Sequence, residues 1–262
     1  MNIKTNNIPA VHNYCDRWCE RCRFIDRCAV GSSEKLLETE LKMDLAMTEE
    51  KRQEIMWQHV ADSFAEAGRL LEKMIEEAGL DIEAIKRDAK ENPYQAPPLT
   101  ENQTKVKELT MNYGKDVHDW MKNNPDLFES DGLVSRVLVQ PDDPEKFLKK
   151  VKDAIETVNW FCFFISVKSQ RACSGKQEDI YDTEEERLQS DANGSAKIAL
   201  IAIGRSMEAW EFLLKAFPEI EFAIIGYLAQ LQKISRYLLL EFPDAQKFIR
   251  PGFDEVQYDH IR

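Results

Sequence analysis

The residues best suited to chemistry in this sequence are four cysteines near its start. Cys15, Cys19, Cys22 and Cys28 follow a C-x3-C-x2-C-x5-C spacing. Thiolates are soft ligands, so they favour zinc and iron–sulfur clusters over magnesium or calcium. The intervening loops are short, and bringing the four sulfurs to one centre therefore costs little closure entropy. The spacing predicts a metal or cluster site formed by these four residues.

Charge around the cysteines is consistent with such a site. Residues 1–30 contain five Lys or Arg and three Asp or Glu, a net charge of +2, whereas the whole chain carries −12. The surrounding arginines would offset the negative charge of four thiolates. Residues 1–14 have no apolar stretch typical of a secretory signal, so we expect a cytoplasmic protein whose thiols stay reduced.

The Cys19–Cys22–Cys28 portion, C-x2-C-x5-C, resembles the last three ligands of the [4Fe–4S] site in adenine-glycosylase-type repair enzymes. It also resembles the iron–sulfur staple of helicase–nuclease and CRISPR-associated nucleases, although the first cysteine is spaced differently in both. The resemblance implies a [4Fe–4S] cluster, with zinc as the alternative because closed four-cysteine sites commonly hold structural zinc. It does not extend to nuclease activity, since no Pro-Asp step here is followed by the D/E-x-K step of those enzymes.

The first three cysteines also match the C-x3-C-x2-C triad of radical S-adenosylmethionine enzymes. Those enzymes need alternating strands and helices downstream, which this sequence does not show, and Cys28 would compete for the open iron site. The whole chain resembles a group of uncharacterised bacterial proteins that open with a Tyr-Cys-Asp-Arg-Trp-Cys-Glu-Arg-Cys motif. That resemblance implies a bacterial origin and no particular activity.

Other motifs point to no enzyme class. The sequence contains no dinucleotide-binding, P-loop or G-x-S-x-G motif. Neither His59 nor His118 stands in the Glu-x-x-His pattern of di-iron bundles. Cys162 and Cys173 are isolated in the sequence, and we expect neither to join the N-terminal site.

A second candidate site consists of charged residues that interrupt two apolar helices. Lys168 and Arg171 are three residues apart and share one helix face, as do Arg205 and Glu208 on the other helix. If the two faces point inward, they form a polar, cofactor-binding site or an internal ion-pair network, because buried charges need partners. The alternative is that they lie on helix surfaces.

The pattern of the remaining chain predicts helices. Apolar residues recur every three or four positions from about Thr48 to Ala78, and further helices are predicted at about 81–90, 100–123, from 143, 195–217 and 218–241. Residues 133–139 could form one short strand, and the acidic stretch 175–195 is predicted to be a loop. The expected core includes eight large residues: Trp57, Val60, Phe64, Val158, Phe161, Ile165, Trp210 and Leu231.

These elements give an all-α fold, a helical bundle of about five main helices with an N-terminal four-cysteine metal-binding segment. We expect the segment to occupy residues 1–33 and the bundle domain residues 34–262. The net charge disfavours nonspecific nucleic-acid binding, and charged residues interrupt the most apolar stretch, 217–242, so no membrane span is expected.

Two functions fit this organisation. The first is a noncatalytic interaction or sensing protein, stapled by a metal or cluster and working through a protein partner. The alternative is an iron–sulfur redox enzyme or electron-transfer protein. A third, weaker interpretation is a nucleic-acid partner that uses the basic cysteine segment, which the acidic body opposes. The sequence indicates neither a substrate nor an oligomeric state.

Overall fold

The computed structural model describes residues 6–33, 35, 39, 48–93, 95, 97–125, 143–177 and 181–254. Within these ranges all regular structure is helical, which confirms the all-α class. The strand predicted at 133–139 lies outside the described residues. None of the helices in the described ranges has an apolar stretch long enough to cross a bilayer.

The chain divides into two compact units. One contains Met1–Asn13 and Arg17–Pro97, with three short 3-10 turns, α2 (Glu49–Glu77) and α3 (Ile82–Glu91). The other contains Tyr14–Asp16 and Pro98–Arg262. The division after residue 33 that we drew from the sequence stays a prediction.

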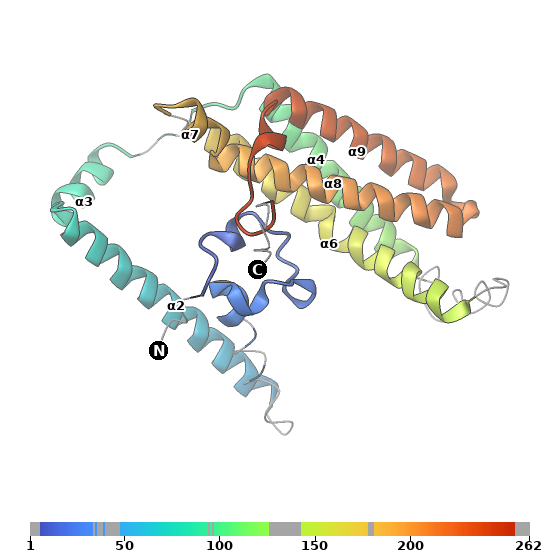
Figure 1. Ribbon diagram of the computed structural model, residues 1–262, viewed down its shortest axis with the longest axis horizontal. Coiled ribbons are helices and arrows are strands. Elements are labelled where there is room, and N and C mark those ends of the chain that lie inside the picture. The colour runs from blue at the N-terminus through green and yellow to red at the C-terminus, as the bar shows by residue number, and fades with distance from the viewer. Residues whose placement is uncertain are drawn as a thin grey trace, which may run out of the picture. The chain divides into compact units, whose positions relative to one another are not determined.

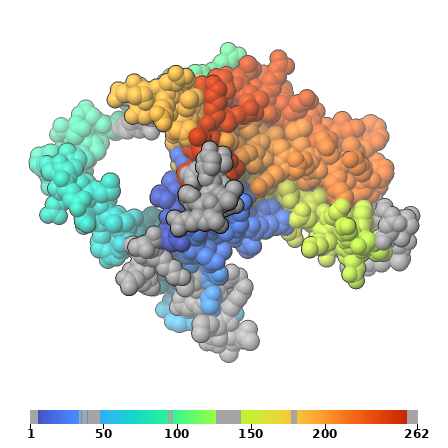
Figure 2. All heavy atoms as spheres, in the orientation of Figure 1, coloured from blue at the N-terminus to red at the C-terminus, as the bar shows by residue number. Residues whose placement is uncertain are grey.

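The second unit is built on four long helices (Figure 1). They are α4 (Glu101–Asn123), α6 (Pro144–Gln177), α8 (Asp191–Ala216) and α9 (Glu221–Glu241). Helix α6 packs against α4 and α8, and α9 packs against the same two helices, so the four enclose one core. Helices α8 and α9 run side by side over one face of this bundle (Figure 2).

The core of the bundle agrees with the periodicity of its sequence. Val158, Phe161, Ile165, Trp210 and Leu231 are all at most 1% exposed, as predicted. At its centre the indole Nε1–H of Trp210 donates to the hydroxyl of Tyr113, on α4, at 3.0 Å. A buried polar group with a partner costs far less than an orphaned one, so this bond lets a large aromatic side chain lie fully inside.

Local capping explains where the helices begin. Thr100 and Gln103 form a reciprocal capping box at the start of α4, and Thr48 caps α2 through the backbone N–H of Lys51. Asp81 accepts two backbone N–H groups at the start of α3. These side chains satisfy donors that a helix N-terminus otherwise leaves unpaired.

The loop predicted at 175–195 is wrong for most of that stretch. Helix α6 extends to Gln177, the short helix α7 covers Glu184–Leu188, and α8 already begins at Asp191. Four of the acidic residues that suggested a solvated loop lie in the first turns of α7 and α8: Glu184, Glu185, Glu186 and Asp191. Carboxylates are favourable there, because a helix N-terminus carries partial positive charge.

The burial predicted for α2 is also wrong. Trp57 is 65% exposed, Phe64 is 76% exposed and Val60 is 36% exposed. The spacing of apolar residues correctly predicted a helix with one apolar face. Periodicity shows which residues share a face, and it carries no information about whether another element covers that face.

Candidate metal centre

The cysteine segment is a series of tight turns that end at cysteines. The 3-10 turn Cys19–Arg21 ends at Cys22, and the turn Ile25–Arg27 ends at Cys28. The backbone N–H of Ile8 donates to the carbonyl of Arg27 at 2.9 Å, which ties the start of the segment to its end. Such turns place successive cysteines on a short, closed stretch of backbone.

Two of the sulfurs accept backbone hydrogen bonds. The N–H of Phe24 donates to Sγ of Cys22 at 3.4 Å, and the N–H of Gly31 donates to Sγ of Cys28 at 3.4 Å. Hydrogen bonds of this kind stabilise a thiolate more than a thiol, and they tune the potential of iron–sulfur clusters. The backbone around these two cysteines therefore supplies hydrogen bonds of the kind found at metal-bound sulfurs.

Cys15 lies in a tripeptide that belongs to the bundle unit. Its neighbour Tyr14 donates its hydroxyl to Oδ1 of Asp191 at 3.1 Å and packs against Phe248 at a tilt of 57°, with ring centroids 4.5 Å apart. The Tyr14 ring also lies directly over Gly194 of α8, where a side chain would collide with it. Cys15 itself is 9% exposed.

The residue on the other side of Cys15 is held as firmly. The carboxylate of Asp16 forms a short ion pair with the guanidinium of Arg205, from α8. The indole Nε1–H of Trp160, from α6, donates to the backbone carbonyl of Asp16 at 3.0 Å. Both neighbours of Cys15 are therefore anchored to the bundle, and we name Tyr14–Cys15–Asp16 the anchor tripeptide.

The anchor contacts include a charged cluster at the start of α8. Asp191 accepts two hydrogen bonds from Arg171, from Nε at 2.9 Å and from Nη2 at 2.5 Å. Burial, and then the negative charge of Asp191, raises the pKa of Tyr14 to about 12. The tyrosine hydroxyl therefore stays protonated at neutral pH and remains a donor to Asp191.

None of the six cysteines, all of which the structure describes, forms a disulfide. Among the side chains that the structure describes, no three His, Cys, Asp or Glu are gathered in a group that could hold a metal ion. The four N-terminal cysteines fit a metal in the chemistry of their donor atoms and in the hydrogen bonds to two of the sulfurs. Their assembly around one centre stays a prediction.

The two remaining cysteines lie in the bundle. Burial raises the pKa of Cys162, and it raises the pKa of Cys173 to about 12, with a further contribution from the charge of Glu241. The thiol of Cys162 donates to the carbonyl of Asn159 at 3.1 Å. Both residues are buried, protonated thiols at neutral pH, which suits packing rather than metal binding.

The charged residues of the second candidate site have separate surroundings. Lys168 is buried, with its Nζ 5.5 Å from the ring centroid of Phe164. Arg171 pairs with Asp191, and Arg205 pairs with Asp16, so both serve the anchor tripeptide. Glu208 is exposed. The two arginines form ion pairs with Asp191 and Asp16, respectively. That the four residues together bind a cofactor stays a prediction.

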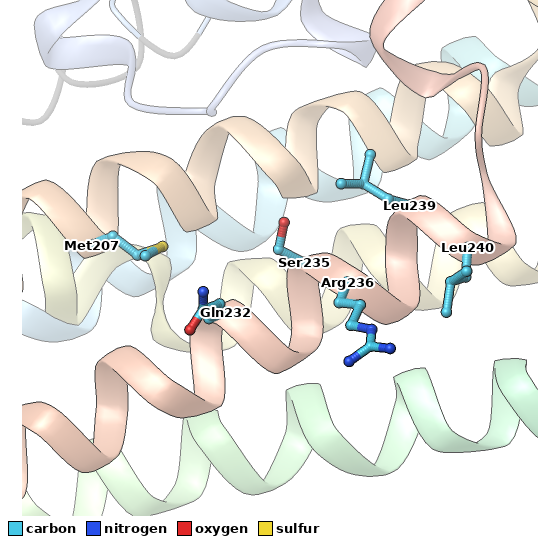
Figure 3. Close-up of a pocket in the computed structure, with 6 residues that line it drawn as sticks. All are labelled: Met207, Gln232, Ser235, Arg236, Leu239 and Leu240. Carbon is cyan, nitrogen blue, oxygen red and sulfur yellow. The ribbon is translucent and has the colours of Figure 1, made fainter.

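A shallow pocket lies elsewhere on the bundle, between α8 and α9 (Figure 3). Its lining residues are Met207, Gln232, Ser235, Arg236, Leu239 and Leu240. This set contains one cation and no carboxylate, thiol or imidazole, so it lacks the paired groups of an acid–base or metal site.

Sequence reasoning missed the anchor residues because their partners are distant along the chain. Tyr14 and Asp191 are 177 residues apart, and Asp16 and Arg205 are 189 residues apart. Gly194, a glycine inside a helix, was a weak local signal of a close approach, because Gly204 and Gly226 are also helical glycines and have no close neighbour. Comparisons with protein-family models, curated proteins and solved structures find no match to this chain.

Proposed function

We propose that Cys15, Cys19, Cys22 and Cys28 bind a [4Fe–4S] cluster, with zinc as the alternative, and that the protein is a stapled interaction or sensing protein. The observation that carries this proposal is the pair of backbone N–H donors at Cys22 and Cys28. Hydrogen bonds to sulfur are typical of cluster sites, and these two lie within a short run of four cysteines that form no disulfide.

Chain geometry is compatible with a shared centre. Only three residues separate Cys15 from Cys19, so their Cα atoms can be at most about 14 Å apart, and shorter separations need only a turn. Cys19 and Cys22 begin and follow a single 3-10 turn. The free energy of the metal–sulfur bonds would outweigh the small entropy cost of closing these short loops.

The sensing role is supported by the anchor tripeptide. Both neighbours of Cys15 are tied to the bundle, Tyr14 to α8 and Asp16 to α6 and α8. A change in metal occupancy at Cys15 would therefore act on contacts that the bundle itself makes. Gain or loss of a cluster would therefore alter the contacts that Asp191 and Arg205 make with the anchor tripeptide.

The test is metal analysis and visible spectroscopy of the full chain purified without oxygen. A [4Fe–4S] cluster would make the protein brown, with broad visible absorbance that bleaches on reduction, whereas zinc would leave it colourless. Reversible reduction together with catalytic turnover would favour the redox alternative over a sensing role. A chain without stoichiometric metal would contradict the proposal.

Two cysteine variants locate the site. Cys22→Ser should lose the metal, while the helical signal of the bundle persists in circular dichroism. Cys162→Ala is the matched control, since it removes a thiol outside the N-terminal segment and should keep the full metal content. Undiminished metal in the Cys22 variant would exclude this residue as a ligand and refute the four-cysteine assignment.

A further inference from the structure

Helix α2 presents an exposed apolar seam with a seven-residue repeat. Trp57, Phe64 and Leu71 are spaced seven apart, and an apolar residue follows each of them by three positions. These are the a and d positions of a coiled-coil heptad. The seam residues are Trp57, Val60, Phe64, Ala67, Leu71 and Met74. We refer to them below as the α2 seam.

The exposed apolar area of this seam and its flanking residues is large enough for a stable protein–protein interface. Phe64 is 76% exposed, Met74 is 66% exposed and Leu71 is 58% exposed, and Met56 and Leu70 extend the exposed apolar surface beside them. With large side chains of about 150–250 Å², these fractions amount to roughly 800 Å² per chain. Two such faces would bury about 1,600 Å², the standard size of a stable protein–protein interface.

Side-chain size favours pairing with a second copy in the antiparallel direction. If Phe64 of one chain faces Ala67 of the other, the largest residue at the middle of the seam meets the smallest. The same register sets the following residues opposite each other: Trp57 with Met74, and Val60 with Leu71. A parallel pair would place Phe64 on Phe64 and Ala67 on Ala67, which leaves crowding at one layer and a void at the other.

We propose that this protein forms a homodimer through antiparallel pairing of two α2 seams. The pairing uses residues 54–77 of each chain and requires no metal, so it stands or falls separately from the cysteine proposal. The central layers are Phe64 against Ala67 of the second copy, with Trp57 against Met74 at both ends.

Sedimentation velocity of the full chain between about 1 and 100 μM tests the association. The wild type should be dimeric in the upper part of this range, and Phe64→Glu should weaken the dimer by about 100-fold or more by placing a charge in the central layer. Ala65→Glu is the matched control, because it adds the same charge one residue away, outside the seam, and should dimerise like the wild type.

Phe64 is already exposed in the single chain, so circular dichroism of its variant should match that of the wild type. A wild type that stays monomeric at about 100 μM would overturn the proposal and leave the seam to another partner or to the chain's own bundle. Equal dimerisation of the Phe64 and Ala65 variants would overturn it as well.

Cross-linking decides the direction. In a Trp57→Cys/Met74→Cys double variant, the two new thiols lie about 25 Å apart within one helix, so a disulfide between positions 57 and 74 must join two chains. Peptide mass spectrometry should find the 57–74 bridge after mild oxidation. Bridges only between identical positions, 57 with 57 and 74 with 74, would show parallel pairing and overturn the antiparallel register.

Discussion

Replacing Gly194 with alanine should loosen the anchor tripeptide. A Cβ at this position would lie 2.6 Å from Cδ1 of Tyr14, closer still to its Cε1, and 2.8 Å from Cζ of Phe248. Ordinary carbon contacts begin near 3.5 Å, so the Tyr14 ring must move away by about 1 Å. That shift would strain or break its 3.1 Å hydrogen bond to Asp191.

The size of the effect follows from a comparison within α8. Gly204 is a second helical glycine, and an added Cβ there would meet nothing within 4 Å. Gly204→Ala should gain up to about 1 kcal/mol of stability from helix propensity. Gly194→Ala gains the same propensity but incurs an overpacking cost of about 1–3 kcal/mol and weakens one hydrogen bond to a carboxylate. It should therefore be less stable than Gly204→Ala by about 2–3 kcal/mol.

Urea unfolding followed by tryptophan fluorescence measures this difference directly. Because the clash acts on the neighbour of Cys15, alkylation of Cys15 should also become faster in the Gly194 variant, as quantified by peptide mass spectrometry. In the Gly204 variant, Cys15 should react at the wild-type rate. Equal stability of the two variants, with equal alkylation of Cys15, would refute the close packing of Tyr14 on α8.

Two other predictions concern the bundle. Phe161→Ala should lower the free energy of unfolding by about 3–5 kcal/mol because the ring is 1% exposed. Phe222→Ala is the control, at an 87% exposed position, and should change the free energy of unfolding by less than about 0.5 kcal/mol. Similar losses in the two variants would place Phe161 outside the core. Burial alone raises the pKa of Glu241, but hydrogen bonds from Asn102 and Lys176 outweigh it, so the net pKa is lowered. Its stabilising contribution is present above the unfolded-state pKa of about 4.3 and is lost as the pH falls through the folded-state pKa. In the Glu241→Gln variant, the free energy of unfolding should therefore fall less steeply as the pH is lowered. Urea unfolding at a series of pH values measures this, and the same pH dependence as in the wild type would contradict it.

The local structure of the helices was predictable from residues close together in the sequence. Thr48, Asp81 and Thr100 stand at the predicted helix starts, and each of them accepts backbone N–H groups there. Pro144 begins α6, as its fixed φ and missing N–H favour. The core around Phe161 followed from apolar spacing because the surrounding helices are apolar on the facing sides. These features depend on residues within a few positions of one another, which is the range that a sequence pattern reports.

The cysteine cluster was equally evident in the sequence, because ligand type and spacing are local properties. Its hydrogen bonds were not, since the N–H groups that reach Cys22 and Cys28 depend on the backbone path of the turns. Asp191 illustrates the same limit. It was counted among charges of a solvated loop, yet it begins α8 and holds Arg171 and Tyr14.

Which apolar and charged faces are covered could be read only from the folded chain. The spacing of Trp57 and Phe64 is as regular as that of Val158 and Ile165, yet the first pair is exposed and the second is buried. Periodicity reports the symmetry of one helix, whereas burial depends on a second surface contributed by distant residues. The anchor contacts of Asp16 are of the same kind, since they join residues 189 positions apart. Such pairs form because the folded bundle brings complementary groups together, and a local sequence pattern does not predict contacts between distant residues.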